Sequence, residues 1–189
     1  MKGISKIIFG AILISILVFA CKNTEKGKVN TAIKTEFKVV KKGNYELYKP
    51  KENIKAVLVL FGGFPEIAED IQKEFKILDL AKNNAVSILY MNYNQTLWME
   101  RDEKQNLAKE LQQIFLENKL PTNNIYIGGF SSGGNVSLLM SDFIVENNLN
   151  IAPKGVFIVD SPIDLVALYR SSEKNLERNF SEIAVQEST

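Results

Sequence analysis

Between Lys55 and Asp160, short apolar runs alternate with longer stretches in which apolar residues recur every three or four positions. The runs Lys55 to Phe61, Asn84 to Tyr93 and Lys154 to Asp160 are rich in β-branched and aromatic residues, as buried strands are. The stretches between them have the spacing of amphipathic helices. Strands that alternate with helices form parallel sheets, because a parallel pair needs a crossover connection. The sequence therefore predicts an α/β fold whose mainly parallel sheet has helices on both faces.

Further segments, inside and outside this region, complete the predicted order of elements. Glu36 to Val40 and Tyr45 to Tyr48 predict an antiparallel hairpin at the start of the domain. The spacing of apolar residues predicts one continuous helix over Glu66 to Lys82. After the last strand, Ile163 to Arg170 and Leu176 to Ile183 are predicted as two further helices.

A serine with glycines two places before and after it stands at the end of the strand Asn124 to Gly128, in the sequence Gly129-Phe130-Ser131-Ser132-Gly133. This is the spacing of a nucleophile elbow, in which a sharp strand-to-helix turn holds a serine hydroxyl out of the backbone. Ser131 is the predicted nucleophile. Ser132 is the competing serine, but the glycines are symmetric about Ser131.

Two other interpretations of Gly128 to Asn135 stay open, a glycine-rich phosphate-binding turn and a purely structural turn. The spacing fits phosphate binding poorly, because no G-x-G-x-x-G occurs there. Asn135 and Val136 also stand where the Walker motif requires Lys and Ser or Thr. We therefore expect neither a cofactor nor a metal.

The strand Lys55 to Phe61 is followed by Gly62-Gly63-Phe64-Pro65. Backbone amides at such a loop and at a helix N-terminus are fixed before reaction, as stabilisation of a developing oxyanion requires. Alternatively, the glycines only end the strand and Pro65 only starts a helix.

The elbow, this loop and their order in the chain resemble the N-terminal part of an α/β hydrolase, over roughly Tyr45 to Asp164. The resemblance implies that Ser131 forms an acyl intermediate with a small-molecule ester, thioester or amide. It also implies that the amide of Ser132, with that of Gly63 or Phe64, forms the oxyanion hole.

The acid and base that such a serine needs are not evident. The chain contains no histidine, the usual general base. Asp160 is a weak candidate for the acid that orients a histidine, and its alternative role is a solvated carboxylate or helix cap; Asp164 is the other acid near a strand end. A Ser-Lys pair is chemically possible, but no lysine is singled out by its spacing.

The resemblance further implies C-terminal strands that these residues do not include. The run Val156 to Val159 would then be an apolar edge, which native proteins usually avoid. We therefore expect 36–189 to be an incomplete α/β-hydrolase-like domain, inactive or nearly so by itself. It is either a fragment of a longer reading frame or a degenerate paralogue.

The N-terminus has the pattern of a targeting segment, with Lys2 and Lys6 before the uncharged run Ile7 to Ala20. Cys21, the only cysteine, follows directly, and Leu17 to Cys21 resembles a bacterial lipoprotein lipobox. This implies a signal peptide over 1–20, lipidation of Cys21, a polar tether over 21–35 and attachment to a membrane of the bacterial cell envelope. A cleaved secretory signal and a signal anchor are the alternatives.

Charge excludes one class of partner. The 23 basic and 22 acidic side chains nearly cancel, and no stretch shows the basic footprint of a nucleic-acid-binding protein. Two functions remain: a membrane-tethered serine hydrolase that lacks its acid-base part here, and a non-catalytic lipoprotein that uses a hydrolase-like scaffold for binding. A nucleotide-binding protein is disfavoured by the glycine spacing.

Overall fold

The computed structural model describes residues 36–93 and 97–187, with side chains described as far as residue 176. All of these residues belong to the unit Lys34–Thr189. The predicted signal peptide, the tether and Cys21 lie outside the described residues, so their assignment stays a prediction.

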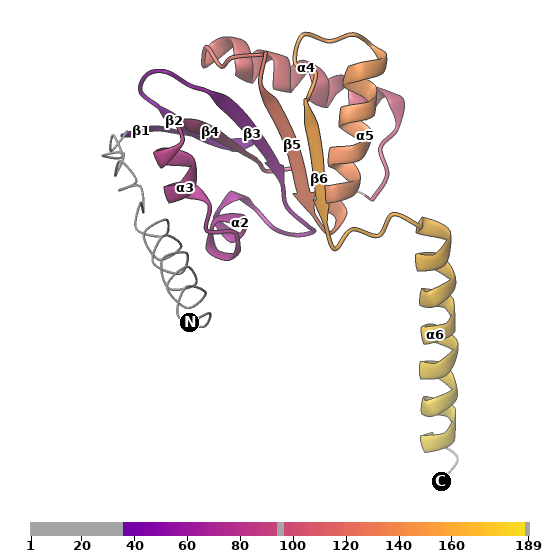
Figure 1. Cartoon of the computed structure of the whole chain (residues 1–189). Helices are drawn as coiled ribbons and strands as arrows, with labels where there is room; N and C mark the ends of the chain where they lie inside the picture. The colour runs from indigo at the N-terminus through magenta and orange to yellow at the C-terminus, as the bar shows by residue number, and fades with distance from the viewer. Residues whose placement is uncertain (1–35, 94–96, 188–189) are drawn as a thin grey trace, which may run out of the picture. The chain divides into compact units, whose positions relative to one another are not determined.

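A sheet of six strands forms the centre of the described domain, in the order β1-β2-β4-β3-β5-β6 (Figure 1). The strands are β1 (Phe37–Lys41), β2 (Tyr45–Pro50), β3 (Ala56–Phe61), β4 (Val86–Met91), β5 (Ile125–Phe130) and β6 (Gly155–Val159). The pairs β4-β3, β3-β5 and β5-β6 are parallel, and the N-terminal hairpin adds β1 and β2 in antiparallel orientation. The predicted α/β fold with a mainly parallel sheet is confirmed.

Helices cover both faces of this sheet (Figure 1). On one face, α4 (Arg101–Glu117) and α5 (Ser132–Glu146) enclose a core that includes Val57, Leu89 and Ile127. On the other face, α2 (Ala68–Glu74) and α3 (Leu78–Asn83) pack over Leu60 and Tyr90. Successive side chains of a strand point to opposite faces, so the nearly continuous apolar strands supply both cores.

The segment Glu66 to Lys82 is two helices, so the prediction of one continuous helix was wrong. The helical backbone ends after Glu74 at Phe75, whose φ is −101° and ψ is 82°. Phe75 contacts the rings of Phe130 and Phe157, with centroid separations of 5.2 and 6.4 Å. The break lets both Phe75 and the residues of α3 pack against the same sheet face.

The C-terminal segment is one helix, α6 (Leu165–Glu187), where two were predicted. Asp164 caps the N-terminus of this helix: its Oδ1 accepts a hydrogen bond of 2.9 Å from the amide of Ala167. The polar residues in its middle contain neither Gly nor Pro, so nothing interrupts the helix. In the described part of the chain, no helix is both long and apolar enough to span a membrane.

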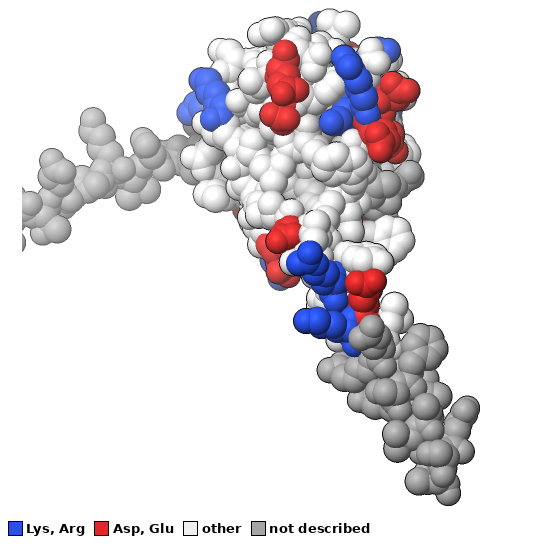
Figure 2. All heavy atoms as spheres, turned by 90° about the vertical axis from the view of Figure 1, so that its right-hand side faces the viewer, with Lys and Arg blue, Asp and Glu red and all other residues white. Residues whose placement is uncertain are grey.

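Charged side chains of both signs are interspersed over the face shown in Figure 2, and much of that face is uncharged. This is the mixed pattern of an ordinary protein surface.

Candidate active site

Ser131 occupies the single position between β5 and α5. Its φ is 49° and its ψ is −126°, a conformation that costs a residue other than glycine about 1–3 kcal/mol. Two backbone hydrogen bonds fix this turn: the Ser131 amide donates to the carbonyl of Val159 at 2.9 Å, and the Gly134 amide donates to the carbonyl of Ser131 at 3.0 Å. The residue is exposed, so the turn presents its side chain to solvent.

The glycines on either side of Ser131 lie where no side chain fits. A Cβ added at Gly129 would overlap the carbonyl of Gly133. A Cβ added at Gly133 would overlap the carbonyls of Phe61 and Gly62 at the end of β3. The spacing that singled out Ser131 therefore has a steric cause, since the backbones of β3, β5 and α5 meet at this turn.

The predicted oxyanion-hole residues come together beside Ser131. A Cβ added at Gly63 would lie 3.0 Å from the Cβ of Ser131, and the amide of Phe64 donates to Ser132 Oγ at 3.0 Å. Ser132 is the first residue of α5. Its amide is therefore one of the first-turn donors that lack an intrahelical acceptor, at the positive end of the helix dipole. The amides of Ser132, Gly63 and Phe64 thus come from one small region.

Glu66 is a member of this site that sequence reasoning missed. Its Oε2 accepts a hydrogen bond of 2.6 Å from the amide of Gly63, and its own amide donates to the carbonyl of Gly63 at 2.6 Å. The Glu66 carboxylate therefore accepts the hydrogen bond of the Gly63 amide, one of the donors predicted for the oxyanion hole. The available signal was an acid three residues after Gly63 and just before a helix, which resembles the reach-back of a capping box.

The two acids differ in their placement. Asp160 follows β6 directly, has a φ of 52° and is exposed. Asp160 lies at the same carboxyl end of the parallel strands as Ser131, because the carbonyl of the preceding residue, Val159, accepts a hydrogen bond from the Ser131 amide. Asp164 instead caps α6. Among the residues that the structure describes, no group of three or more Cys, Asp or Glu is arranged to hold a metal ion.

Neither a protein-family model nor a curated protein matches the chain. Solved structures do. The Francisella virulence factor BioJ matches with a TM-score of 0.50 and 19% identity, over 83% of this chain and 50% of that one. A candidate esterase from Staphylococcus aureus matches with a TM-score of 0.50 and 13% identity, over 87% and 55%. The substrate-bound fluorophosphonate-binding serine hydrolase FphF of Staphylococcus aureus matches with a TM-score of 0.52 and 10% identity, over 70% and 58%.

These similarities define the fold class. The chain has a sheet and helix arrangement of the α/β-hydrolase type, the scaffold of its esterase and serine-hydrolase neighbours. It spans about half the length of these structures. Because fold does not determine function, activity has to be argued from the site itself.

Proposed function

We propose that this protein is a serine hydrolase of α/β-hydrolase type that acts on a small-molecule ester, thioester or amide. The observation that supports this best is the position of Ser131, exposed on a strained turn with the loop Gly63–Phe64 and the N-terminus of α5 beside it. Strained backbone persists where the surrounding structure enforces it, and it clusters at functional sites.

The proposed chemistry is acyl transfer. Ser131 Oγ forms a bond to the carbonyl carbon of the substrate, and the carbonyl electron pair moves onto the oxygen. The amide of Ser132 stabilises that oxyanion, because it is oriented before the reaction. The amide of Gly63 or Phe64 adds a second hydrogen bond once it leaves its present acceptor, Glu66 Oε2 or Ser132 Oγ. The bond to the leaving group then breaks, and the leaving group departs with the proton from Ser131. Water cleaves the acyl-serine in the same way.

The proton of Ser131 needs an acceptor during the attack, and the 189 residues contain no histidine. A positioned general base typically contributes about 10²- to 10⁴-fold to the rate. We therefore expect slow reaction of this chain by itself. Asp160 remains a weak candidate for an acid that would orient a base.

The test is labelling of the 189-residue chain with a fluorophosphonate probe, with and without free imidazole. We expect slow labelling that increases with imidazole concentration, because imidazole supplies the missing base. Ser131→Ala should abolish it, and the control Ser171→Ala, which removes an exposed serine of α6, should not. Absence of Ser131-dependent labelling in a folded chain with imidazole present would contradict the hydrolase proposal.

Two observations favour a second candidate, a non-catalytic binding protein on a hydrolase-like scaffold. The chain has no histidine, and the Glu66 carboxylate already occupies the Gly63 amide. This candidate predicts that imidazole has no effect on labelling.

We further propose that the protein is anchored to a membrane of the bacterial cell envelope through lipid at Cys21. The proposal is supported by the charged residues Lys2 and Lys6, the uncharged run that follows them, and the position of the only cysteine at the end of that run.

A further inference from the structure

A cavity of about 230 Å³ lies between α2 and the carboxyl end of β5, next to the Ser131 turn. Its lining residues are Glu66, Ile71, Glu74, Phe75 and Phe130. Phe130 directly precedes Ser131, and Glu66 Oε2 would lie 3.4 Å from a Cβ at Gly63 that is itself 3.0 Å from Ser131 Cβ. The cavity therefore lies beside the Ser131 turn, with Glu66 and Phe130 between it and Ser131.

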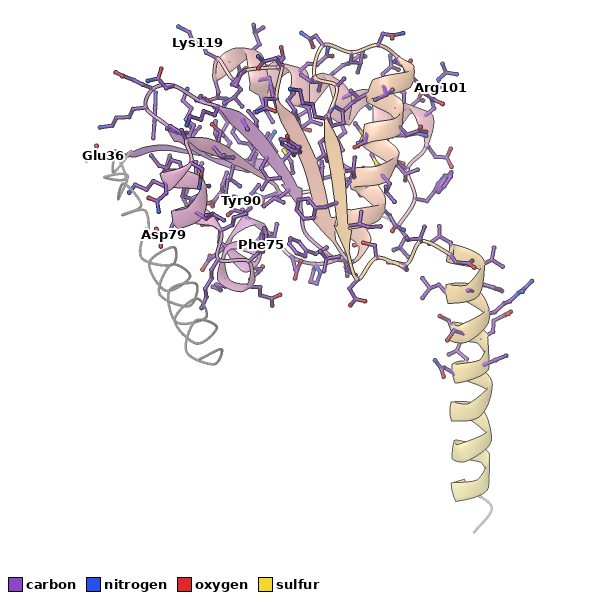
Figure 3. The ribbon with its side chains drawn as sticks, in the orientation of Figure 1. Glu36, Phe75, Asp79, Tyr90, Arg101 and Lys119 are labelled. Atoms are coloured by element: carbon purple, nitrogen blue, oxygen red, sulfur yellow. The ribbon has the colours of Figure 1, made fainter. Side chains whose placement is uncertain are left out.

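Aromatic rings form much of the apolar wall. Phe75 lies between α2 and the ends of β5 and β6 (Figure 3) and packs edge to face on Phe130, with centroids 5.2 Å apart and planes at 62°. Phe157 continues this cluster behind Phe130, at 6.4 Å and 76°. The face of an aromatic ring carries partial negative charge, and it attracts a cation within about 6 Å of the centroid.

The charged residues of the cavity are both acidic. Glu66 is partly buried and Glu74 is exposed at the rim, and no Lys or Arg is among the described lining residues. Lys73, the basic side chain of α2, lies 3.2 Å from Glu69 and 3.9 Å from Asp70. The cavity thus combines two carboxylates with aromatic walls, which is the chemistry that recognises organic cations.

We propose that this cavity binds a positively charged organic nitrogen group, and that the substrate carries such a group beside its scissile bond; the second part depends on the proposed hydrolase function. The cavity is smaller than the roughly 300–1,000 Å³ of pockets for drug-sized ligands. It therefore accommodates one ammonium group of a larger molecule, whose acyl carbon reaches Ser131.

The experiment titrates the 189-residue chain with tetramethylammonium chloride and, separately, with tert-butanol, an uncharged molecule of similar shape. Backbone amide NMR shifts of Glu74, Phe75 and Phe130 report binding. We expect tetramethylammonium to bind about tenfold more tightly than tert-butanol, equivalent to about 1.4 kcal/mol. Its affinity should fall as NaCl is added, because Glu74 is exposed and its charge is screened.

Two variants separate the ring from the charge. Phe75→Leu removes the π face but keeps an apolar side chain, and Glu74→Gln removes the rim charge without loss of volume; each should weaken tetramethylammonium binding severalfold. Glu69→Gln, on the same helix but paired with Lys73, is the matched control and should bind as the wild type does. Equal affinity for the two probes, or equal effects of Glu74→Gln and Glu69→Gln, would overturn the proposal.

The labelling and titration experiments fail independently. Ser131-dependent labelling without selective tetramethylammonium binding would leave the hydrolase proposal in place and reject the cation site. Selective binding without labelling would reject the hydrolase proposal, and it would establish the cavity as a cation site of a binding protein.

Discussion

Gly133 lies where the first turn of α5 passes against the end of β3, and its environment is made of backbone atoms. Backbone cannot rotate away as a side chain can. We predict that Gly133→Ala lowers the free energy of unfolding by about 2 kcal/mol or more, because overpacking of a close contact forces the main chain to move. Urea denaturation followed by circular dichroism measures this.

The matched control is Gly43→Ala, since a Cβ at Gly43 would have no atom within 4 Å. This change should alter the free energy of unfolding by less than about 0.5 kcal/mol. Similar urea midpoints for the two variants would contradict a steric role of Gly133.

The sequence predicted the turn at Ser131, but not every residue that contacts the site. Ser131, Gly129 and Gly133 were predictable because a close backbone approach leaves a fixed spacing of small residues. Glu66 was not, because its contact with the Gly63 amide depends on how the loop folds back over itself. A single acid before a helix is too common to indicate such a contact.

Among the secondary-structure elements, the strands were predictable, but the division into helices was wrong in two segments, at α2 and α3 and at α6. The strands are apolar almost throughout because both faces are covered, so the sequence marks them clearly. No glycine or proline lies between α2 and α3, so the sequence carries no signal for the break. It arises because Phe75 packs against Phe130 and Phe157, and these residues are distant in the sequence.

The Glu46 carboxylate accepts hydrogen bonds from residues of β1, β2 and α2, so the stability that it contributes should depend on pH. Burial raises the pKa of Glu46, but hydrogen bonds from Lys41 of β1, Gln72 of α2 and Tyr48 of β2 outweigh burial and leave the pKa below its ordinary value. A carboxyl group with a lowered pKa in the folded state stabilises the fold above its unfolded pKa, and this stability is lost as the pH falls through the folded pKa.

We predict that Glu46→Gln lowers the free energy of unfolding at pH 7 by about 0.5–1 kcal/mol, a modest value because Lys41 is largely exposed. The difference from wild type should shrink as the pH falls through the lowered pKa of Glu46 and the carboxyl group becomes protonated. Urea titrations at several pH values measure it, with Glu52→Gln, an exposed residue after β2, as the control. A difference that does not change with pH would show that packing, not charge, is the cause.

For the protein as a whole, the proposed membrane anchor can be tested at one residue, because lipid would attach to the sulfur of Cys21. Cys21 is the only cysteine, so a thioether-linked lipid has a single place to form. We predict that the protein incorporates a labelled fatty acid during growth and that Cys21→Ala abolishes the label. Phe19→Leu, which keeps the cysteine and the apolar run, should retain it. Equal labelling of wild type and Cys21→Ala would refute the anchor.

The contact between Glu66 and the Gly63 amide also bears on the choice of inhibitors for this site. Glu66 is an anion tethered by a three-residue loop, and a short tether corresponds to a local concentration on the order of millimolar or above. A boronate or phosphonate that presents its own negative oxygen to Gly63 must displace this built-in competitor. Neutral ligands that leave the amide to Glu66 and fill the adjacent space avoid that competition, so a screen of uncharged and cationic fragments is expected to yield more hits here than a screen of transition-state mimics.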